Sequence, residues 1–153
     1  MKITLLSHER ELLRPSNSGA LVLATLPEIA ERRVWQRKKA DAEWLEMMAE
    51  GRSVLVYPVE QLTCPALHVG ELDHFILIDA TWQESRKIYN RSPYLQELPA
   101  LHLDAPVASQ YRLRRNQQPG ALCTAEVVIQ LLRQQGELQS AALMQQAFEL
   151  FNE

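Results

Sequence analysis

Hydrophobic and polar positions alternate in short blocks along this chain of 153 residues. Short aliphatic and β-branched runs closed by turn or breaker residues predict strands; they cover 2–7, 53–58, 74–79 and, more weakly, 100–104. Apolar residues at helical spacing predict helices; these cover 40–51, 82–91, 124–136 and about 139–151. Strands that alternate with helices favour one α/β domain over residues 1–153, with a largely parallel sheet flanked by helices.

The composition is that of an ordinary globular domain, with 46% hydrophobic and 23% charged residues. The longest apolar runs fall far short of the roughly 20 residues that a membrane span needs. Residues 1–13 lack the unbroken apolar core of a signal peptide. Cys64 and Cys123 form no CxxC pair, and the four histidines show no metal-ligand spacing. We therefore expect a cytoplasmic protein with no metal site and no membrane partner.

The net charge of −3 hides a strong segregation of charge along the chain. Residues 32–39 (RRVWQRKK) hold five of the sixteen basic residues and no acid, and three more bases lie in each of 85–91 and 111–116. Segregated charge of this kind can form a positive face that follows phosphates. The alternative is a set of separately solvated faces, with Trp35 anchoring a basic helix to the core.

Ligands of parallel α/β proteins bind beyond the carboxyl ends of the strands. Three segments qualify by position: 56–58 (VYP), 79–82 (DATW) and 119–126 (PGALCTAE). In the second, Thr81 and Glu84 fit a helix capping box. The cap does not explain Asp79, because a carboxylate after an apolar strand is costly to desolvate unless it is paired. Asp79 is thus a candidate functional residue, with a turn-forming or ion-paired aspartate as the alternative.

Two polar segments add candidate contacts for phosphates or a cofactor. Residues 14–19 (RPSNSG) read either as a turn or as a loop rich in side-chain donors. Residues 109–126 combine alternating bases and Tyr111 with a Pro-Gly turn and a helix start. The alternative there is a solvated edge strand, followed by a helix with Thr124 as its cap and Glu126 near its positive end. The glycine-rich Rossmann and Walker patterns are absent.

Taken in order, four motifs resemble the signatures of the DTW-domain family: HERELLRPSNSG, VYP, DATWQESRKIYNRSP and YRLRRNQQPGALCTAE. They span roughly residues 7–130, and the Asp-x-Thr-Trp element that names the family is Asp79, Thr81 and Trp82 here. This family belongs to the SPOUT superfamily and acts as tRNA-uridine aminocarboxypropyltransferases. The resemblance implies a SPOUT-like fold with a C-terminal trefoil knot, one of the rare knotted topologies.

The resemblance also implies a reaction. S-adenosylmethionine would donate its 3-amino-3-carboxypropyl group to N3 of a tRNA uridine, forming acp3U and leaving methylthioadenosine. The implied contacts to S-adenosylmethionine are Pro58, Asp79, Thr81, Trp82, Leu122, Cys123, Thr124 and Glu126. The implied contacts to tRNA are Arg14, Asn17, Arg37, Lys87, Arg91, Arg112, Arg114 and Arg115, within basic segments 32–39, 86–91 and 112–115 that would grip phosphates.

This chain departs from the family pattern in a few places. It reads Ser16-Asn17-Ser18 where relatives often read Thr-Asn-Thr, and Cys123 stands where Ser is common. The chain opens almost at the first motif, ahead of which many members carry a Cys-rich zinc segment, so no metal is expected. Superfamily members are often dimers, but no interface is visible in the sequence.

Two questions stay open at this point. Asp79 could accept the imide proton as a general base. Because aspartate is a weak base for so weak an acid, it could instead hold the ammonium or sulfonium of the donor in position. The alternatives to the whole assignment are a SPOUT-type RNA methyltransferase, which would share the cofactor, and a non-catalytic RNA-binding module. The sequence does not identify the uridine that is modified.

Overall fold

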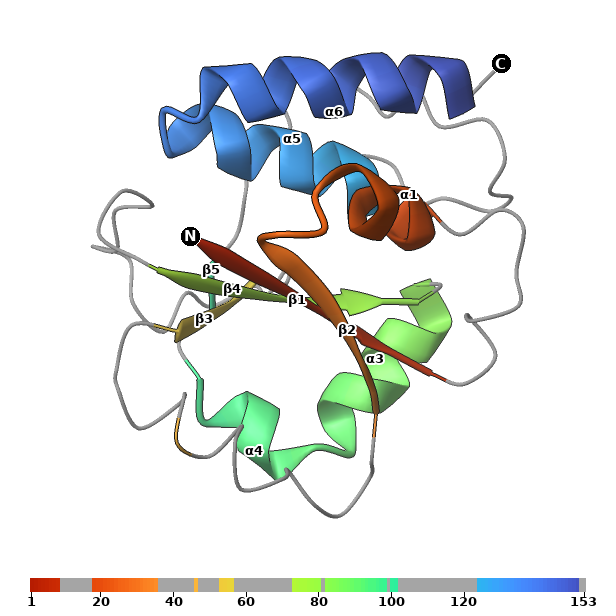
Figure 1. Ribbon diagram of the computed structural model, residues 1–153. Coiled ribbons are helices and arrows are strands. Elements are labelled where there is room, and N and C mark those ends of the chain that lie inside the picture. Colours follow the sequence, from red (N-terminus) through yellow and green to blue (C-terminus); the bar gives the residue numbers. More distant parts are fainter. Residues whose placement is uncertain are drawn as a thin grey trace.

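The computed structural model describes residues 1–8, 18–35, 46, 53–56, 73–80, 82–98, 100–101 and 124–151 (Figure 1). The strands form one sheet in the order β2-β1-β4-β3-β5, and every neighbouring pair is parallel. The strands are β1 (Lys2–Ser7), β2 (Ala30–Val34), β3 (Ser53–Val56), β4 (His74–Asp79) and β5 (Ala100–Leu101). The helices are α1 (Ser18–Thr25), α3 (Trp82–Asn90), α4 (Pro93–Gln96), α5 (Thr124–Gln134) and α6 (Leu138–Phe151).

Helices cover both faces of the sheet. Helices α1, α5 and α6 pack on one face, and α3 and α4 lie on the other (Figure 1). Side chains of a strand point alternately to its two faces, so Ile3 and Leu5 enter the first layer while Leu6 enters the second. A parallel sheet covered on both sides needs strands that are apolar on both faces. This explains the continuous aliphatic runs of β1 and β4.

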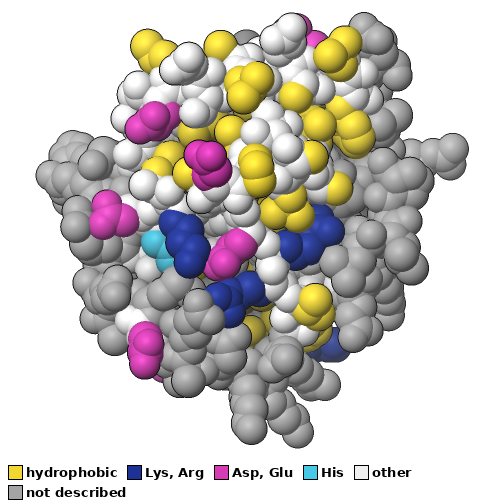
Figure 2. Space-filling view, in the orientation of Figure 1, with side chains coloured by type: hydrophobic (Ala, Val, Ile, Leu, Met, Phe, Trp, Pro, Cys, Tyr) yellow, Lys and Arg dark blue, Asp and Glu magenta, His cyan; other side chains and the backbone are white. Residues whose placement is uncertain are grey.

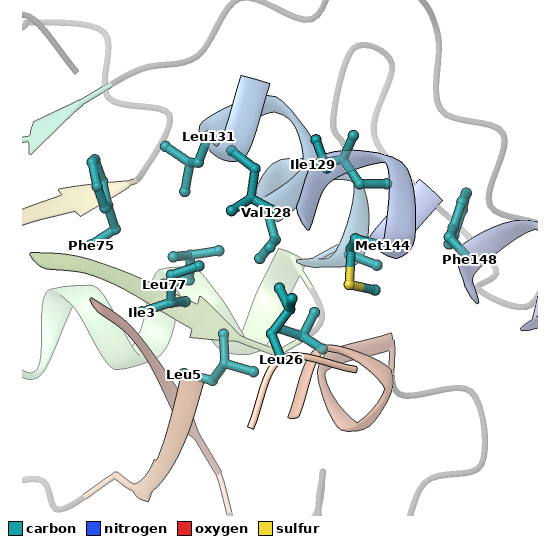
Figure 3. Close-up of a cluster of buried hydrophobic side chains, with 14 of the residues drawn as sticks. Ile3, Leu5, Leu26, Phe75, Leu77, Val128, Ile129, Leu131, Met144 and Phe148 are labelled. Carbon is teal, nitrogen blue, oxygen red and sulfur yellow. The ribbon is translucent and has the colours of Figure 1, made fainter. Parts of the chain in front are cut away.

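The larger core lies between the sheet and α5 and α6. Figure 3 shows Phe75 and Leu77 of β4 on the sheet side of this core, with Leu131 and Val128 of α5 on the helix side. The smaller core holds Leu6, Leu55, Ile76, Ile88 and Leu95, with Trp35 packed against it. Together the two cores fix the sheet and place the start of α5 above it.

The predicted α/β class with a parallel sheet is confirmed. Strands 2–7 and 74–79 have the predicted bounds, and α3, α5 and α6 agree with prediction to within two residues. Of the predicted helix 40–51 the structure describes Glu46, which is helical, and the rest lies outside the described residues. The ends of predicted strands 53–58 and 100–104 also lie outside them, as does the segment 102–123 on which the expected knot depends.

Three elements were not predicted: α1, β2 and α4. Helix α1 has the sequence SGALVLAT, which is apolar on all sides and so lacks the one-sided pattern that reveals a surface helix. Strand β2 has the sequence AERRV and its first four residues are half-buried. As an edge strand it tolerates charged residues, so the basic stretch that begins at Arg32 starts on a strand and not on a helix.

The order of the strands defines where a ligand site is expected. From β1 the chain runs through α1 to β2 on one side, whereas from β4 it runs through α3 and α4 to β5 on the other. The connections therefore leave β1 and β4 in opposite directions, and the crevice beyond their carboxyl ends is the usual binding position in such sheets. Ser7 and Asp79 face each other in register at this point.

Within the described part of the chain, no helix is both long enough and apolar enough to cross a membrane.

Candidate active site beyond strands β1 and β4

Asp79, the last residue of β4, is completely buried, with 0% of its surface exposed. Its Oδ1 accepts a hydrogen bond of 2.8 Å from Oγ1 of Thr124. Its Oδ2 accepts one of 3.1 Å from Nη2 of Arg32 and a longer one of 3.4 Å from Oγ of Ser7. The ion pair and hydroxyl donors compensate the carboxylate for the water it has lost. The ion-paired alternative raised by the sequence thus describes its surroundings correctly.

Four elements bring these side chains together. Ser7 and Asp79 end neighbouring strands and point to the same face as Leu5 and Leu77, which lie in the core beneath α5. Alternation along β2 sends Arg32 to that same face, because Ala30 also packs against this core. Helix α5 begins at Thr124, directly above the carboxylate. The site is therefore a product of β1, β2, β4 and α5 jointly.

Two helices start beside Asp79. Ser18, the first residue of α1, is fully buried, and its Oγ accepts a hydrogen bond of 3.2 Å from the backbone N–H of Ala125 in α5. The first turn of a helix exposes backbone donors and carries a partial positive charge. The edge of the site thus combines a buried anion with two helix starts. Glu126, half-buried, lies in the same first turn of α5.

A second polar network occupies the opposite ends of the strands, on the face toward α3. Nε2 of His74 lies 2.7 Å from Oγ1 of Thr4, and its Nδ1 lies 3.0 Å from Oγ of Ser53. Oγ1 of Thr4 donates to Glu31 at 3.2 Å. Since a threonine hydroxyl has one proton, His74 donates from Nε2 and accepts at Nδ1, as a neutral imidazole does.

Burial lowers the pKa of His74 to about 4, and the charges of Lys2 and Arg33 push it the same way while Glu31 opposes them. For Glu31, burial acts to raise the pKa, but Lys2 and Arg33 outweigh it and the net shift is downward. Glu31 lies 3.3 Å from both Nζ of Lys2 and Nε of Arg33. Basic and acidic side chains accordingly lie side by side on the face shown in Figure 2. This network joins four strands, β1 to β4, and does not include Asp79.

The structure brings together two of the predicted cofactor contacts, Asp79 and Thr124, with Glu126 in the same first turn of α5 as Thr124 and Trp82 at the start of α3. Thr124 was also considered as a cap for its own helix, but its hydroxyl donates to Asp79. Of the predicted tRNA contacts, Lys87 and Arg91 are exposed on and just after α3. The remaining predicted site residues lie outside the described part: Pro58, Thr81, Leu122, Cys123, Arg14, Asn17, Arg37, Arg112, Arg114 and Arg115.

One expectation about the basic segment 32–39 is corrected. Its first two arginines do not face solvent: the side chains of Arg32 and Arg33 are only 14% and 17% exposed and pair with Asp79 and Glu31. The physical reason is that the segment starts on a strand whose side chains turn inward over its neighbour. Ser18 belongs to the donor-rich loop 14–19 that the sequence offered for phosphate or cofactor contacts, and Arg32 belongs to the basic segment that was expected to contact tRNA. In the structure both contribute to the surroundings of Asp79 instead. Ser7 is the one of these site residues that the sequence did not single out.

Among the described residues, no group of three or more His, Cys, Asp and Glu side chains is placed to hold a metal ion.

The structure defines an α/β protein with a parallel sheet and a buried, ion-paired aspartate at its topological switch point, the position where such proteins usually bind ligands. The model of the DTW domain matches residues 1–153, so the chain belongs to the DTW-domain family. It is also similar to tRNA-uridine aminocarboxypropyltransferase 2 of Drosophila melanogaster, with 30% identity over 102 residues. The match covers 63% of this chain and only 38% of that relative. No solved structure matches the chain.

Proposed function

We propose that this protein transfers the 3-amino-3-carboxypropyl group of S-adenosylmethionine to N3 of a tRNA uridine, which forms acp3U and releases methylthioadenosine and the N3 proton, the latter to solvent. The observation that carries the proposal is the position of Asp79. This residue of the Asp-x-Thr-Trp element lies at the switch point of the sheet, beside the start of α5. Family membership and the name of the similar Drosophila protein support the choice of reaction.

The charges at this edge suit S-adenosylmethionine. The donor carries a sulfonium, an ammonium and a carboxylate, and the edge offers a buried carboxylate beside the starts of α1 and α5. Helix starts favour carboxylates, while Glu126 favours cationic centres. When bound, the donor supplies an electrophilic carbon whose sulfur leaves as a neutral thioether. The first turn of α5 would hold it, with the buried Asp79 fixing Thr124 from beneath.

Of the two roles considered for Asp79, we favour the positioning role. A general base must reach the proton that it removes within hydrogen-bond distance. Asp79 is fully buried and already accepts hydrogen bonds from Arg32, Ser7 and Thr124. Its carboxylate, whose charge is balanced by Arg32, orients the side chains around it and so shapes the donor site. Such positioning of the reacting carbon accelerates transfer without proton exchange at the aspartate.

The outward face of α3 is the described surface best suited to tRNA. Ser85 and Ile88 of this helix are buried against the sheet, whereas Arg86, Lys87 and the following Arg91 are exposed. Their side chains form a cationic face that can replace counterions along a phosphate backbone. The helix begins within the Asp-x-Thr-Trp element itself. RNA held along α3 would therefore extend from the carboxyl edge of the sheet, where the proposed donor site lies, over the face opposite α5.

We also infer that the C-terminal half is knotted as in SPOUT proteins. The support is membership of the DTW-domain family; the connection 102–123, on which the knot depends, lies outside the described residues. A solved structure that traces this connection would decide the topology.

The function is tested by incubating purified protein with unmodified tRNA and S-adenosylmethionine labelled either in the methyl group or in the carboxypropyl chain. Nucleosides and the spent donor are then identified by mass spectrometry. We expect label from the carboxypropyl chain alone in uridine, together with methylthioadenosine. Methyl label in RNA with S-adenosylhomocysteine would instead identify a methyltransferase. Salt-sensitive tRNA binding without either product would identify a binding module.

A further inference from the structure

We propose that Arg32 is a positioning residue of this site: through its ion pair with Asp79 it fixes Thr124 and the first turn of α5. The part of the inference that concerns S-adenosylmethionine rests on the proposed function. The structural part of the inference is independent of that function: a residue of β2 controls the start of α5 through a buried carboxylate.

Arg32 reaches Asp79 from two strands away. Strand β1 lies between β2 and β4, and Arg32 is in register with Leu5 of β1. Its Nη2 nevertheless lies 3.1 Å from Oδ2 of Asp79, and its side chain is only 14% exposed. The guanidinium therefore lies across the end of β1, where Ser7 also donates to the same carboxylate oxygen. This is an interior ion pair and not a contact with solvent.

The pair matters because the carboxylate has no exposure of its own. A buried carboxylate that loses its cation is strongly disfavoured and either takes up a proton or moves. Either change would disturb the 2.8 Å hydrogen bond that Oδ1 accepts from Thr124. Charge-assisted bonds of this kind are short and directional. Arg32 thus holds Asp79 in place, Asp79 holds Thr124, and Thr124 fixes the start of α5.

Arg33 provides a matched comparison. It is the next residue on the same strand, its side chain is 17% exposed, and it pairs with Glu31 at 3.3 Å. Alternation sends it to the opposite face of the sheet, into the network around His74. Changing Arg33 removes one positive charge and one ion pair from β2, as changing Arg32 does, without touching the site.

The test compares Arg32→Met, Arg32→Lys and Arg33→Met with the parent chain. Hydrogen exchange followed by mass spectrometry reports on the first turn of α5, and calorimetry reports on S-adenosylmethionine affinity. For Arg32→Met we expect faster exchange in that turn, unchanged exchange in α6, and affinity weaker by about tenfold, the effect of removing one charge-assisted bond. Arg32→Lys should restore most of both signals, and Arg33→Met should leave both close to the parent values.

Kinetics separate positioning from a general loss of packing. If Arg32 acts on the donor site, Arg32→Met should raise KM for S-adenosylmethionine while KM for tRNA stays near the parent value. Equal changes in both KM values, or parent-like exchange at α5, would overturn the inference. Since exchange needs no turnover, a parent protein without transfer activity would refute the proposed function and still leave the role of Arg32 decided.

A double variant covers the case in which Arg32→Met folds poorly because it leaves the buried carboxylate of Asp79 without its cation. Combining Arg32→Met with Asp79→Asn removes both charges together. If the two residues act as a unit, the double variant should be no worse than Asp79→Asn alone in α5 exchange and donor affinity. Losses that simply add would contradict the proposal.

Discussion

Two buried threonines allow the site to be separated from the stability of the sheet. Thr124 donates to Asp79 at the carboxyl end of the strands, and Thr4 donates to Glu31 nearer their amino ends. We expect Thr124→Val and Thr4→Val each to lower the free energy of unfolding by about 1–3 kcal/mol, because each leaves a buried polar partner unsatisfied. Denaturant titration measures this.

Of these two changes, only Thr124→Val should affect the binding of S-adenosylmethionine. We expect Thr124→Val to weaken S-adenosylmethionine binding by about tenfold, since the loss of one hydrogen bond in the site is of that order. Thr124→Ser, which keeps the hydroxyl, is the control for side-chain volume and should bind nearly as the parent does. Equal weakening by Thr4→Val in calorimetry would show that the effect is global.

His74 makes stability depend on pH in a defined window. Its pKa is about 4 in the folded chain against an ordinary 6.5, so the unfolded chain binds the proton more readily. The contribution is fully present above pH 6.5 and is lost as pH falls toward 4, by up to about 3 kcal/mol. Glu31, whose pKa is also lowered, loses its own contribution only below its ordinary 4.5.

Unfolding by urea at several pH values between 4.5 and 6.5 therefore isolates His74. We expect His74→Gln to flatten the pH dependence of the free energy of unfolding in that window. His8→Gln, which changes a histidine outside the network, should retain the slope of the parent. A slope that survives in His74→Gln would contradict this account.

The same residues show what a sequence can and cannot reveal. Asp79 was identifiable because a carboxylate after an apolar strand needs an explanation. Its partner Arg32 lies 47 residues away, and the hydrogen bond between Ala125 and Ser18 spans 107 residues. No local pattern encodes such pairs, because they arise only when the strand order is known. The aspartate was therefore predictable, and Thr124 was predicted beside it from the family motif, but the pairing of Asp79 with Arg32 and Ser7 was not.

At the scale of elements, predictability follows burial pattern. Strands β1 and β4 were predictable because both of their faces are covered, which requires a continuous apolar run. Helix α5 was predictable because only one of its sides is apolar. Strand β2 was not predicted because its two arginines pair with Asp79 and Glu31, and charged residues in a row look like a solvated stretch in the sequence. Helix α1 escaped for the opposite reason, being apolar on every side. The elements missed are thus an edge strand with charged residues and a short helix without a polar side.

The cationic face of α3 gives a prediction at this scale. We expect the double change Lys87→Ala with Arg91→Ala to weaken tRNA binding several-fold at low salt. The slope of log affinity against log salt should fall by about one for each phosphate that is no longer neutralised. Filter binding at several salt concentrations measures both quantities, and S-adenosylmethionine affinity should not change.

The control for α3 is Arg133→Ala. Arg133 is also exposed, but it lies at the far end of α5, on the opposite face of the sheet. Removing it changes the net charge without altering α3. If Arg133→Ala reduced the salt slope as much per charge as the α3 changes do, the RNA would follow the overall field of the protein and not this helix.

At the scale of the whole molecule, the site lies where the two halves of the sheet meet. One half is built from β1, α1 and β2, the other from β3, β4, β5, α3 and α4, and α5 rests on both. Asp79 receives hydrogen bonds from β1, β2 and α5. Separation of these parts breaks the site, so a ligand bound there should stabilise the complete fold and not a single lobe.

This coupling gives the last prediction. S-adenosylmethionine at 100 times its Kd should add about 2.7 kcal/mol to the free energy of unfolding, a rise in Tm of roughly 5–10 °C for a domain of this size. Differential scanning fluorimetry measures it. The increase should be much smaller in Arg32→Met than in Arg33→Met at the same donor concentration, because only the former loosens the start of α5. An equal increase in both variants would mean that the donor binds without using the carboxyl ends of β1 and β4, and that the buried aspartate serves the fold alone.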